Sequence, residues 1–171
     1  MTEQIAFTAA AALDLVIKLE QAGATFYRKA AAAVQDEEIA TTLLQLASEE
    51  DKHEEKYEHL KETYLATDGG GVDANSAVRG FVDIFMEDEI FDGDAFEKLT
   101  VSGLDIQEIL RAATEAEYKT IALVSALREM IPAFADQKWV NAVIAEELTH
   151  IETLGRLQRS QRNAAANAAL T

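Results

Sequence analysis

The chain contains no cysteine, and this absence removes several kinds of site at once. Disulfides, thiolate zinc sites, iron–sulfur clusters and rubredoxin-type centres all need cysteine sulfur. Any metal must therefore be bound through oxygen and imidazole nitrogen. Proline occurs once and glycine eight times in 171 residues, while Ala, Leu, Glu and Gln are frequent. This composition predicts an all-α chain, because few residues would interrupt a helix.

Basic residues are scarce relative to acidic ones. With 15 Lys and Arg against 31 Asp and Glu, the formal net charge is −16. Such a charge repels nucleic acid and anionic membrane surfaces, so we expect neither as a partner. It also attracts cations, but solubility alone would explain it equally well. Charge therefore argues against some partners without identifying a metal protein.

The beginning of the chain lacks a long uninterrupted apolar run. Its first 21 residues, MTEQIAFTAAAALDLVIKLEQ, have no basic residue before the apolar stretch, and Lys18 and Glu20 soon interrupt it. This segment predicts neither a signal peptide nor a membrane-spanning helix. We expect a cytoplasmic protein.

Apolar periodicity predicts four helices, at about 9–34, 37–66, 106–130 and 137–162. Residues typical of N-caps precede them: Thr8, Asp36, Asp105 and Asp136. The length fits one domain over 1–171, with a hairpin at about 9–66, a crossover at 67–104, a second hairpin at about 105–162 and a tail at 163–171. A crossover of this length is expected if the second and third helices run parallel, since the chain must return along the bundle. A short helix is expected within it, at 81–90.

Charged residues recur at a constant spacing of 97 residues. Glu20, Glu50 and His53 reappear as Glu117, Glu147 and His150. The glutamate that directly precedes Glu50 recurs as well, because Glu49 corresponds to Glu146. Such self-similarity predicts two helical hairpins of like construction.

The six recurring residues fall on the faces that heptad periodicity turns inward. In an antiparallel hairpin, two residues are level when they are equally far from the turn, and the midpoint of Glu20 and Glu50 is Gln35. By the same count, Glu117 and Glu147 are level in the second hairpin. Each hairpin therefore places a lone glutamate opposite a Glu-x-x-His pair. Glu49 and Glu146, one residue earlier, are expected to turn away from this seam.

Four buried carboxylates at one level need positive charge, since each desolvated charge would cost several kcal/mol. Two divalent cations supply that charge, and neutral imidazoles can complete their ligand sets. An i, i+3 pair lies on one helix face, so each Glu-x-x-His pair can reach one ion. A single such pair would be a coincidence more often than not in a glutamate-rich chain, and a hydrogen-bonded polar layer is the alternative. Two pairs, two lone glutamates and equal spacing favour a dinuclear metal site.

The segments LEQAGATFYRKAA, SEEDKH, ATEAEYKTIA and AEELTH, which contain these residues, resemble the rubrerythrin and ferritin-like superfamily of di-iron carboxylate proteins. The likeness extends over nearly the whole chain and implies a ferritin-like four-helix bundle. It implies that Glu50 and Glu147 bridge two irons. It also implies that Glu20 and Glu117 bind one iron each, and that His53 and His150 cap the two ions. Tyr27 resembles a family tyrosine that hydrogen-bonds a ligand carboxylate, although an ordinary core tyrosine is the alternative.

Two departures from rubrerythrin concern electrons and ligands. The chain lacks the cysteine-rich rubredoxin domain, so electrons must come from bound ferrous ions or from a separate donor protein. Thr120 stands where rubrerythrin has a further glutamate. Because Thr120 and Gly23 are both small, we expect free volume beside the metal pair.

The resemblance implies an oxidoreductase in which a di-ferrous centre reacts with dioxygen or hydrogen peroxide. Ferroxidase or peroxide-reductase activity would serve iron handling and protection from oxidative stress, with manganese or zinc as substitutes for iron. The alternatives are a di-iron substrate hydroxylase and a metal-binding or storage module with little turnover. We expect a homodimer, because the tail offers no fifth helix for a ferritin-style cage.

Overall fold

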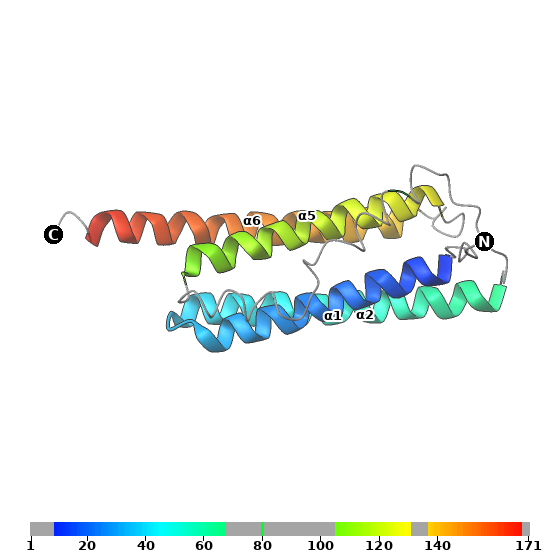
Figure 1. Ribbon diagram of the computed structural model, residues 1–171, viewed down its shortest axis with the longest axis horizontal. Helices are drawn as coiled ribbons and strands as arrows, with labels where there is room; N and C mark the ends of the chain where they lie inside the picture. Colours follow the sequence, from blue (N-terminus) through cyan, green and yellow to red (C-terminus); the bar gives the residue numbers. More distant parts are fainter. Residues whose placement is uncertain (1–8, 68–79, 81–104, 131–136, 169–171) are drawn as a thin grey trace, which may run out of the picture.

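The computed structural model describes residues 9–67, 80, 105–130 and 137–168, and these residues contain helices but no strand. The helices are α1 (Ala9–Ala33), α2 (Glu37–Thr67), α5 (Ile106–Met130) and α6 (Gln137–Ala168) (Figure 1). The all-α prediction is confirmed, and the expected bounds agree closely except that α6 continues beyond residue 162. The short helix expected at 81–90 and the N-caps expected at Thr8 and Asp136 lie outside the described residues.

Two helix starts are held by the aspartates that the sequence indicates. Asp36 Oδ1 accepts hydrogen bonds from the backbone N–H groups of Glu38 at 3.0 Å and Ile39 at 3.1 Å. Asp105 Oδ1 accepts one from the backbone N–H of Gln107 at 2.8 Å. These bonds satisfy N–H groups that have no partner within the helix, and so define where α2 and α5 begin.

The helices form two antiparallel hairpins, α1 with α2 and α5 with α6, which lie along one another (Figure 1). Ala30 near the end of α1, Leu43 early in α2, Leu110 early in α5 and Leu154 late in α6 belong to one buried apolar cluster. This cluster requires α2 and α5 to run in the same direction. The parallel arrangement that would account for the long crossover is therefore present.

Buried apolar side chains lie on both sides of the middle of the bundle. One layer includes Leu43 and Leu110, and the residues Leu13, Val16, Leu123, Val124 and Val143 lie beyond the middle in the other direction, each at most 1% exposed. Burying a side chain of this size stabilises the fold by about 1.5–3 kcal/mol. The two layers thereby fix how each helix is rotated about its axis, and so decide which residues face the interior between them. None of the described helices combines the length and apolarity that a membrane crossing requires.

Candidate metal centre

The middle of the bundle contains a layer of buried acidic and imidazole side chains. Its six members are all at most 3% exposed: Glu20, Glu50, His53, Glu117, Glu147 and His150. Each of the four described helices contributes, since α1 and α5 supply one glutamate each and α2 and α6 supply a Glu-x-x-His pair each. The structure thus brings together all six residues singled out in the sequence.

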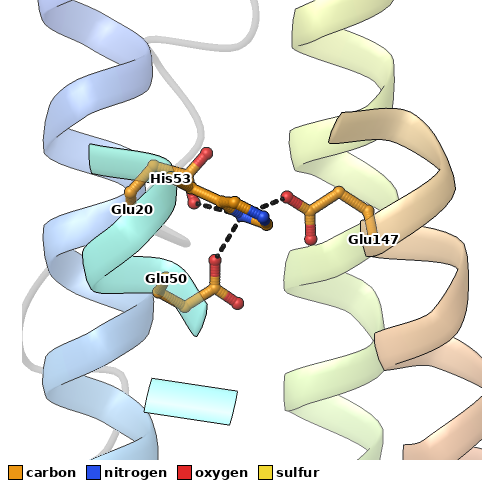
Figure 2. Close-up of side chains that lie close together, drawn as sticks. All are labelled: Glu20, Glu50, His53 and Glu147. Carbon is orange, nitrogen blue, oxygen red and sulfur yellow. Dashed lines mark ion pairs between the residues drawn. The ribbon is translucent and has the colours of Figure 1, made fainter. Parts of the chain in front are cut away.

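One half of this layer surrounds the Nδ1 atom of His53 (Figure 2). Glu147 Oε1 lies 2.9 Å from this nitrogen, Glu50 Oε2 lies 3.3 Å away and Glu20 Oε2 lies 3.8 Å away. Glu147 comes from the opposite hairpin. This half is therefore assembled by tertiary packing rather than within one hairpin.

The other half surrounds the Nδ1 atom of His150 in the same way. Glu147 Oε2 lies 3.1 Å from this nitrogen, Glu50 Oε1 lies 3.2 Å away and Glu117 Oε1 lies 3.5 Å away. The two imidazole rings are stacked, with centroids 5.6 Å apart and planes inclined by 22°. The 97-residue repeat in the sequence is thus visible as two equivalent halves of one site.

Glu50 and Glu147 belong to both halves. Each of these carboxylates directs one oxygen toward His53 and its other oxygen toward His150. Ligand atoms of Glu20, Glu50, His53 and Glu147 all lie within 4.8 Å of one another, and the same holds for Glu50, Glu117, Glu147 and His150. Two four-residue sets that share two carboxylates can hold two neighbouring ions.

Several polar atoms in this layer are buried without a hydrogen-bond partner. They are Glu20 Oε1, Glu50 Oε1, both oxygens of Glu147, and Nδ1 of His53 and of His150. Leaving such atoms unsatisfied costs about 1–3 kcal/mol each, and more where the group is charged. Oxygen and nitrogen atoms that converge on a common space suit metal cations, and oxygen with imidazole is a donor set that iron, manganese and zinc accept.

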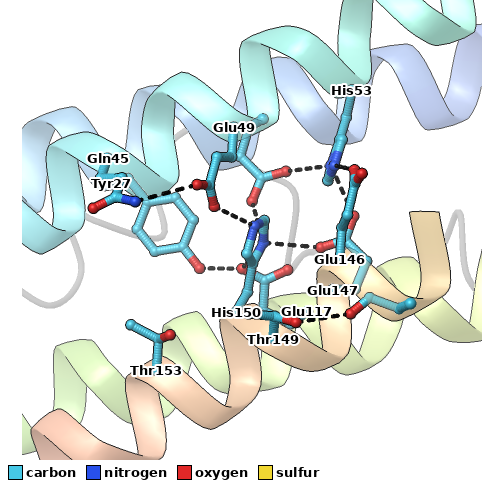
Figure 3. Close-up of polar contacts among 12 residues, drawn as sticks. Tyr27, Gln45, Glu49, His53, Glu117, Glu146, Glu147, Thr149, His150 and Thr153 are labelled. Carbon is cyan, nitrogen blue, oxygen red and sulfur yellow. Dashed lines mark hydrogen bonds and ion pairs between the residues drawn. The ribbon is translucent and has the colours of Figure 1, made fainter. Parts of the chain in front are cut away.

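The outer nitrogens of the two histidines bind carboxylates across the bundle (Figure 3). His53 Nε2 lies 2.7 Å from Glu146 Oε2, and His150 Nε2 lies 2.9 Å from Glu49 Oε2. The expectation that Glu49 and Glu146 turn away from the site was therefore wrong. The side chain of Glu49 extends from a flank of α2 to His150 of α6, and the side chain of Glu146 extends from a flank of α6 to His53 of α2. A carboxylate on the outer nitrogen orients the ring and leaves Nδ1 available as a ligand atom.

Tyr27 and Gly23 complete the surroundings of the glutamates. Tyr27 is 2% exposed, and its hydroxyl donates a hydrogen bond to Glu117 Oε1, a carboxylate contact of the kind that the family resemblance implies. A Cβ atom added to Gly23 would lie 3.6 Å from Glu50 Cγ, in ordinary van der Waals contact. Glu50 therefore lies against Gly23, on the side where free volume was expected. Thr120 is buried, at 5% exposed.

The pKa values of the buried groups in this layer are shifted in opposite directions. Burial raises the pKa of Glu20 and of Glu117 well above the ordinary value, which favours the protonated form of both. Burial would also raise the pKa values of Glu50 and Glu147, but hydrogen bonds from the nearby histidines outweigh burial and lower both values. The pKa of Glu50 falls to about 2. Burial disfavours protonated His53, yet the carboxylates around it raise its pKa to about 12, and the pKa of His150 is raised likewise. These shifts favour two protonated and two ionised carboxylates beside two protonated histidines, a combination without net charge.

Comparison with known proteins supports the architecture. Neither protein families nor curated proteins give a match. A crystal structure from Thermotoga maritima, provisionally described as a ferritin-like diiron-carboxylate protein, superposes with a TM-score of 0.64 at 23% sequence identity. The superposition covers 90% of this chain and 96% of that one. The chain therefore has the ferritin-like helical-bundle fold, with a buried Glu/His cluster that could hold metal at its centre.

Proposed function

We propose that this chain is a di-iron oxidoreductase of rubrerythrin-like type, which oxidises ferrous iron and reduces dioxygen or hydrogen peroxide. The observation that carries the proposal is the division of the Glu50 and Glu147 oxygens between the two histidines. A carboxylate needs two differently directed oxygens to bridge a pair of ions. A simple hydrogen-bonded polar layer would not require this arrangement twice.

In the proposed assignment, Glu50 and Glu147 are bridging ligands. Glu20 and His53 would complete the ligand set of one ion, and Glu117 and His150 would complete that of the other. Four carboxylates balance two divalent ions, so the loaded site is neutral like the protonated one. Ferritin-like di-iron proteins have the same ligand pattern: one Glu from each of two helices and Glu-x-x-His from each of the other two.

Two ferrous ions supply two electrons when bound, enough with two protons to convert one peroxide into two waters or one dioxygen into one peroxide. The residues of the chain supply binding and surroundings for that chemistry. Apolar layers on both sides of the site limit the access of water. The Tyr27 hydroxyl holds Glu117 in place. Because the chain has no cysteine-bound relay, renewed reduction needs fresh ferrous ions or an external donor protein.

The test is an anaerobic ferrous titration of metal-free protein, followed by exposure to dioxygen or peroxide. We expect two irons per chain and their oxidation upon mixing. The double variant Glu50→Ala, Glu147→Ala should lose both irons, whereas Glu58→Ala, Glu152→Ala, which removes two exposed glutamates from the same helices, should bind as the wild type does. Uptake of many irons would indicate storage instead, and two bound irons that resist oxidation would contradict the proposal.

A further inference from the structure

The carboxylates behind the two histidines have unequal surroundings. Glu146 Oε2 is shared, because it lies 2.7 Å from His53 Nε2 and also 2.7 Å from the Lys56 ammonium nitrogen. One carboxylate oxygen therefore interacts with both an ammonium group and an imidazole. Figure 3 shows Glu146 beside His53.

Glu49, behind His150, has no such cation. Its Oε2 lies 2.9 Å from His150 Nε2, and its Oε1 accepts a hydrogen bond from the neutral amide of Gln45 at 3.4 Å. No lysine or arginine in the described part of the chain forms an ion pair with Glu49. The repeat explains the difference, because the residue 97 positions after Lys56 is Thr153. Thr153 Oγ1 accepts a hydrogen bond from Arg156 at 3.1 Å.

A carboxylate that accepts the outer N–H of a histidine makes the inner nitrogen a stronger donor to metal, and loss of such a carboxylate typically costs 10–100-fold in affinity. An ammonium group on the same oxygen opposes this effect, because it withdraws the negative charge that polarises the ring. The side chains of Lys56 and Glu146 are 38% and 47% exposed, so solvent screens part of the interaction. The expected effect is smaller than removal of the carboxylate, about 3- to 10-fold in affinity.

We propose that Lys56 is a positioning residue that makes the two metal positions inequivalent. It acts through Glu146 on His53, so the ion bound by Glu20 and His53 is held less tightly than it would be without Lys56. The ion at His150 is not affected. This inference rests on the proposed binding of two ions, and it gives the centre one position from which an ion can exchange more readily.

Zinc tests this directly, because it is redox-inert and diamagnetic. The full chain, freed of metal, is titrated with Zn²⁺ by calorimetry, and the Nε2–H signals of His53 and His150 are followed by NMR. Lys56→Met should tighten one binding step about 3- to 10-fold and move the His53 signal downfield, as its hydrogen bond to Glu146 strengthens, with the His150 signal unchanged. Lys56→Arg keeps the cation and should behave like the wild type.

Two further variants separate this effect from general charge and from folding. Lys52→Met removes an equal charge from an exposed position one turn earlier in α2 and should change neither affinity nor signal. Thr153→Lys introduces a cation at the position that repeats Lys56, and should weaken the ion at His150 instead.

The role of Lys56 would be overturned if Lys56→Met and Lys52→Met changed zinc affinity equally, or if Lys56→Met changed neither the zinc affinities nor the NMR signals. Either result would leave the di-iron proposal intact. A wild-type chain that binds no second zinc ion would overturn both.

Discussion

Glu147 of α6 is held between two imidazoles, with Oε1 2.9 Å from Nδ1 of His53 in the other hairpin. Its second oxygen lies 3.1 Å from Nδ1 of His150 on its own helix. A single side chain thereby links the two hairpins and the two halves of the site. Its loss should affect both halves, whereas loss of a histidine should affect one.

The first prediction follows from this difference. Glu147→Ala should reduce occupancy at both metal positions, because one oxygen is lost from each. His53→Ala should weaken mainly one position and leave about one ion per chain. Metal analysis after equilibration with limiting Co²⁺, together with calorimetry, checks this. Loss of both ions in His53→Ala with retention of both in Glu147→Ala would contradict the shared role of Glu147.

The second prediction concerns protons released on metal binding. The pKa values of Glu20, Glu117 and both histidines are all raised, which favours a proton on each of the four groups in the metal-free site. Metal ligands must be deprotonated, so binding of two divalent ions should release about four protons. Calorimetry in buffers of different ionisation enthalpy measures this number. Release of only about two protons, those of the histidines, would show that Glu20 and Glu117 are already ionised.

The third prediction concerns stability and pH. The raised pKa of His53, about 12 when folded, stabilises the metal-free fold fully below about pH 6.5, and this contribution falls as pH rises toward 12. The lowered pKa of Glu50 stabilises it above about pH 4.5, and this contribution is lost as pH falls toward 2. The raised pKa values of Glu20 and Glu117 make the fold less stable as pH rises above about 4.5. Metal-free protein should therefore be most stable in mildly acidic solution.

Divalent metal should then raise the melting temperature more at pH 7 than at pH 5, where protons compete for the same atoms. Thermal unfolding followed by circular dichroism, with and without Mn²⁺ or Zn²⁺, tests both statements. A metal-induced shift that is the same at both pH values would mean that the glutamates are solvated.

The fourth prediction isolates Tyr27. Tyr27→Phe removes the hydroxyl that donates to buried Glu117 and leaves a polar atom unsatisfied. The free energy of unfolding of the metal-free protein should fall by about 1–3 kcal/mol. Tyr118→Phe is the matched control, since Tyr118 is 57% exposed on α5. Urea unfolding curves should separate the two, and equal stability of both variants would show that the hydrogen bond contributes nothing net.

The fifth prediction tests the close approach of α1 to Glu50. In Gly23→Ala the new Cβ would meet Glu50 Cγ at 3.6 Å, a distance that needs no rearrangement. Alanine also favours the helix over glycine, so the metal-free protein should gain about 0.5–1 kcal/mol in stability. Gly23→Leu should instead displace Glu50 and lower zinc affinity. Destabilisation by alanine, seen in the same urea experiment, would show that Glu50 lies closer than the structure places it.

The helices and the six buried residues could be predicted from sequence because they depend on local regularities. A helix repeats every 3.6 residues, so the positions of Glu20, Glu50 and His53 relative to neighbouring apolar residues already indicate the inward face. Asp36 and Asp105 precede helices for a reason that is equally local, since the cap bonds N–H groups two or three residues away. The end of α6 could not be fixed from sequence because residues 163–168, NAAANA, favour a helix by propensity but show no apolar pattern, so the tail could either fray or extend the helix. Figure 1 shows this end projecting beyond the start of α5 and the turn between α1 and α2.

The partners of Glu49 and Glu146 depended on tertiary structure. Heptad periodicity correctly placed both on a flank of their helices, but it says nothing about which helix lies beside that flank or how far a flexible glutamate can reach. Only the packing of α2 against α6 brings Glu146 within 2.7 Å of both His53 and Lys56, and Glu49 within 2.9 Å of His150. The direction in which a side chain leaves a helix is set by the residues within a few turns of it. Its contacts with other helices are set by the burial of apolar layers throughout the bundle, which brings together residues about 90 to 100 positions apart.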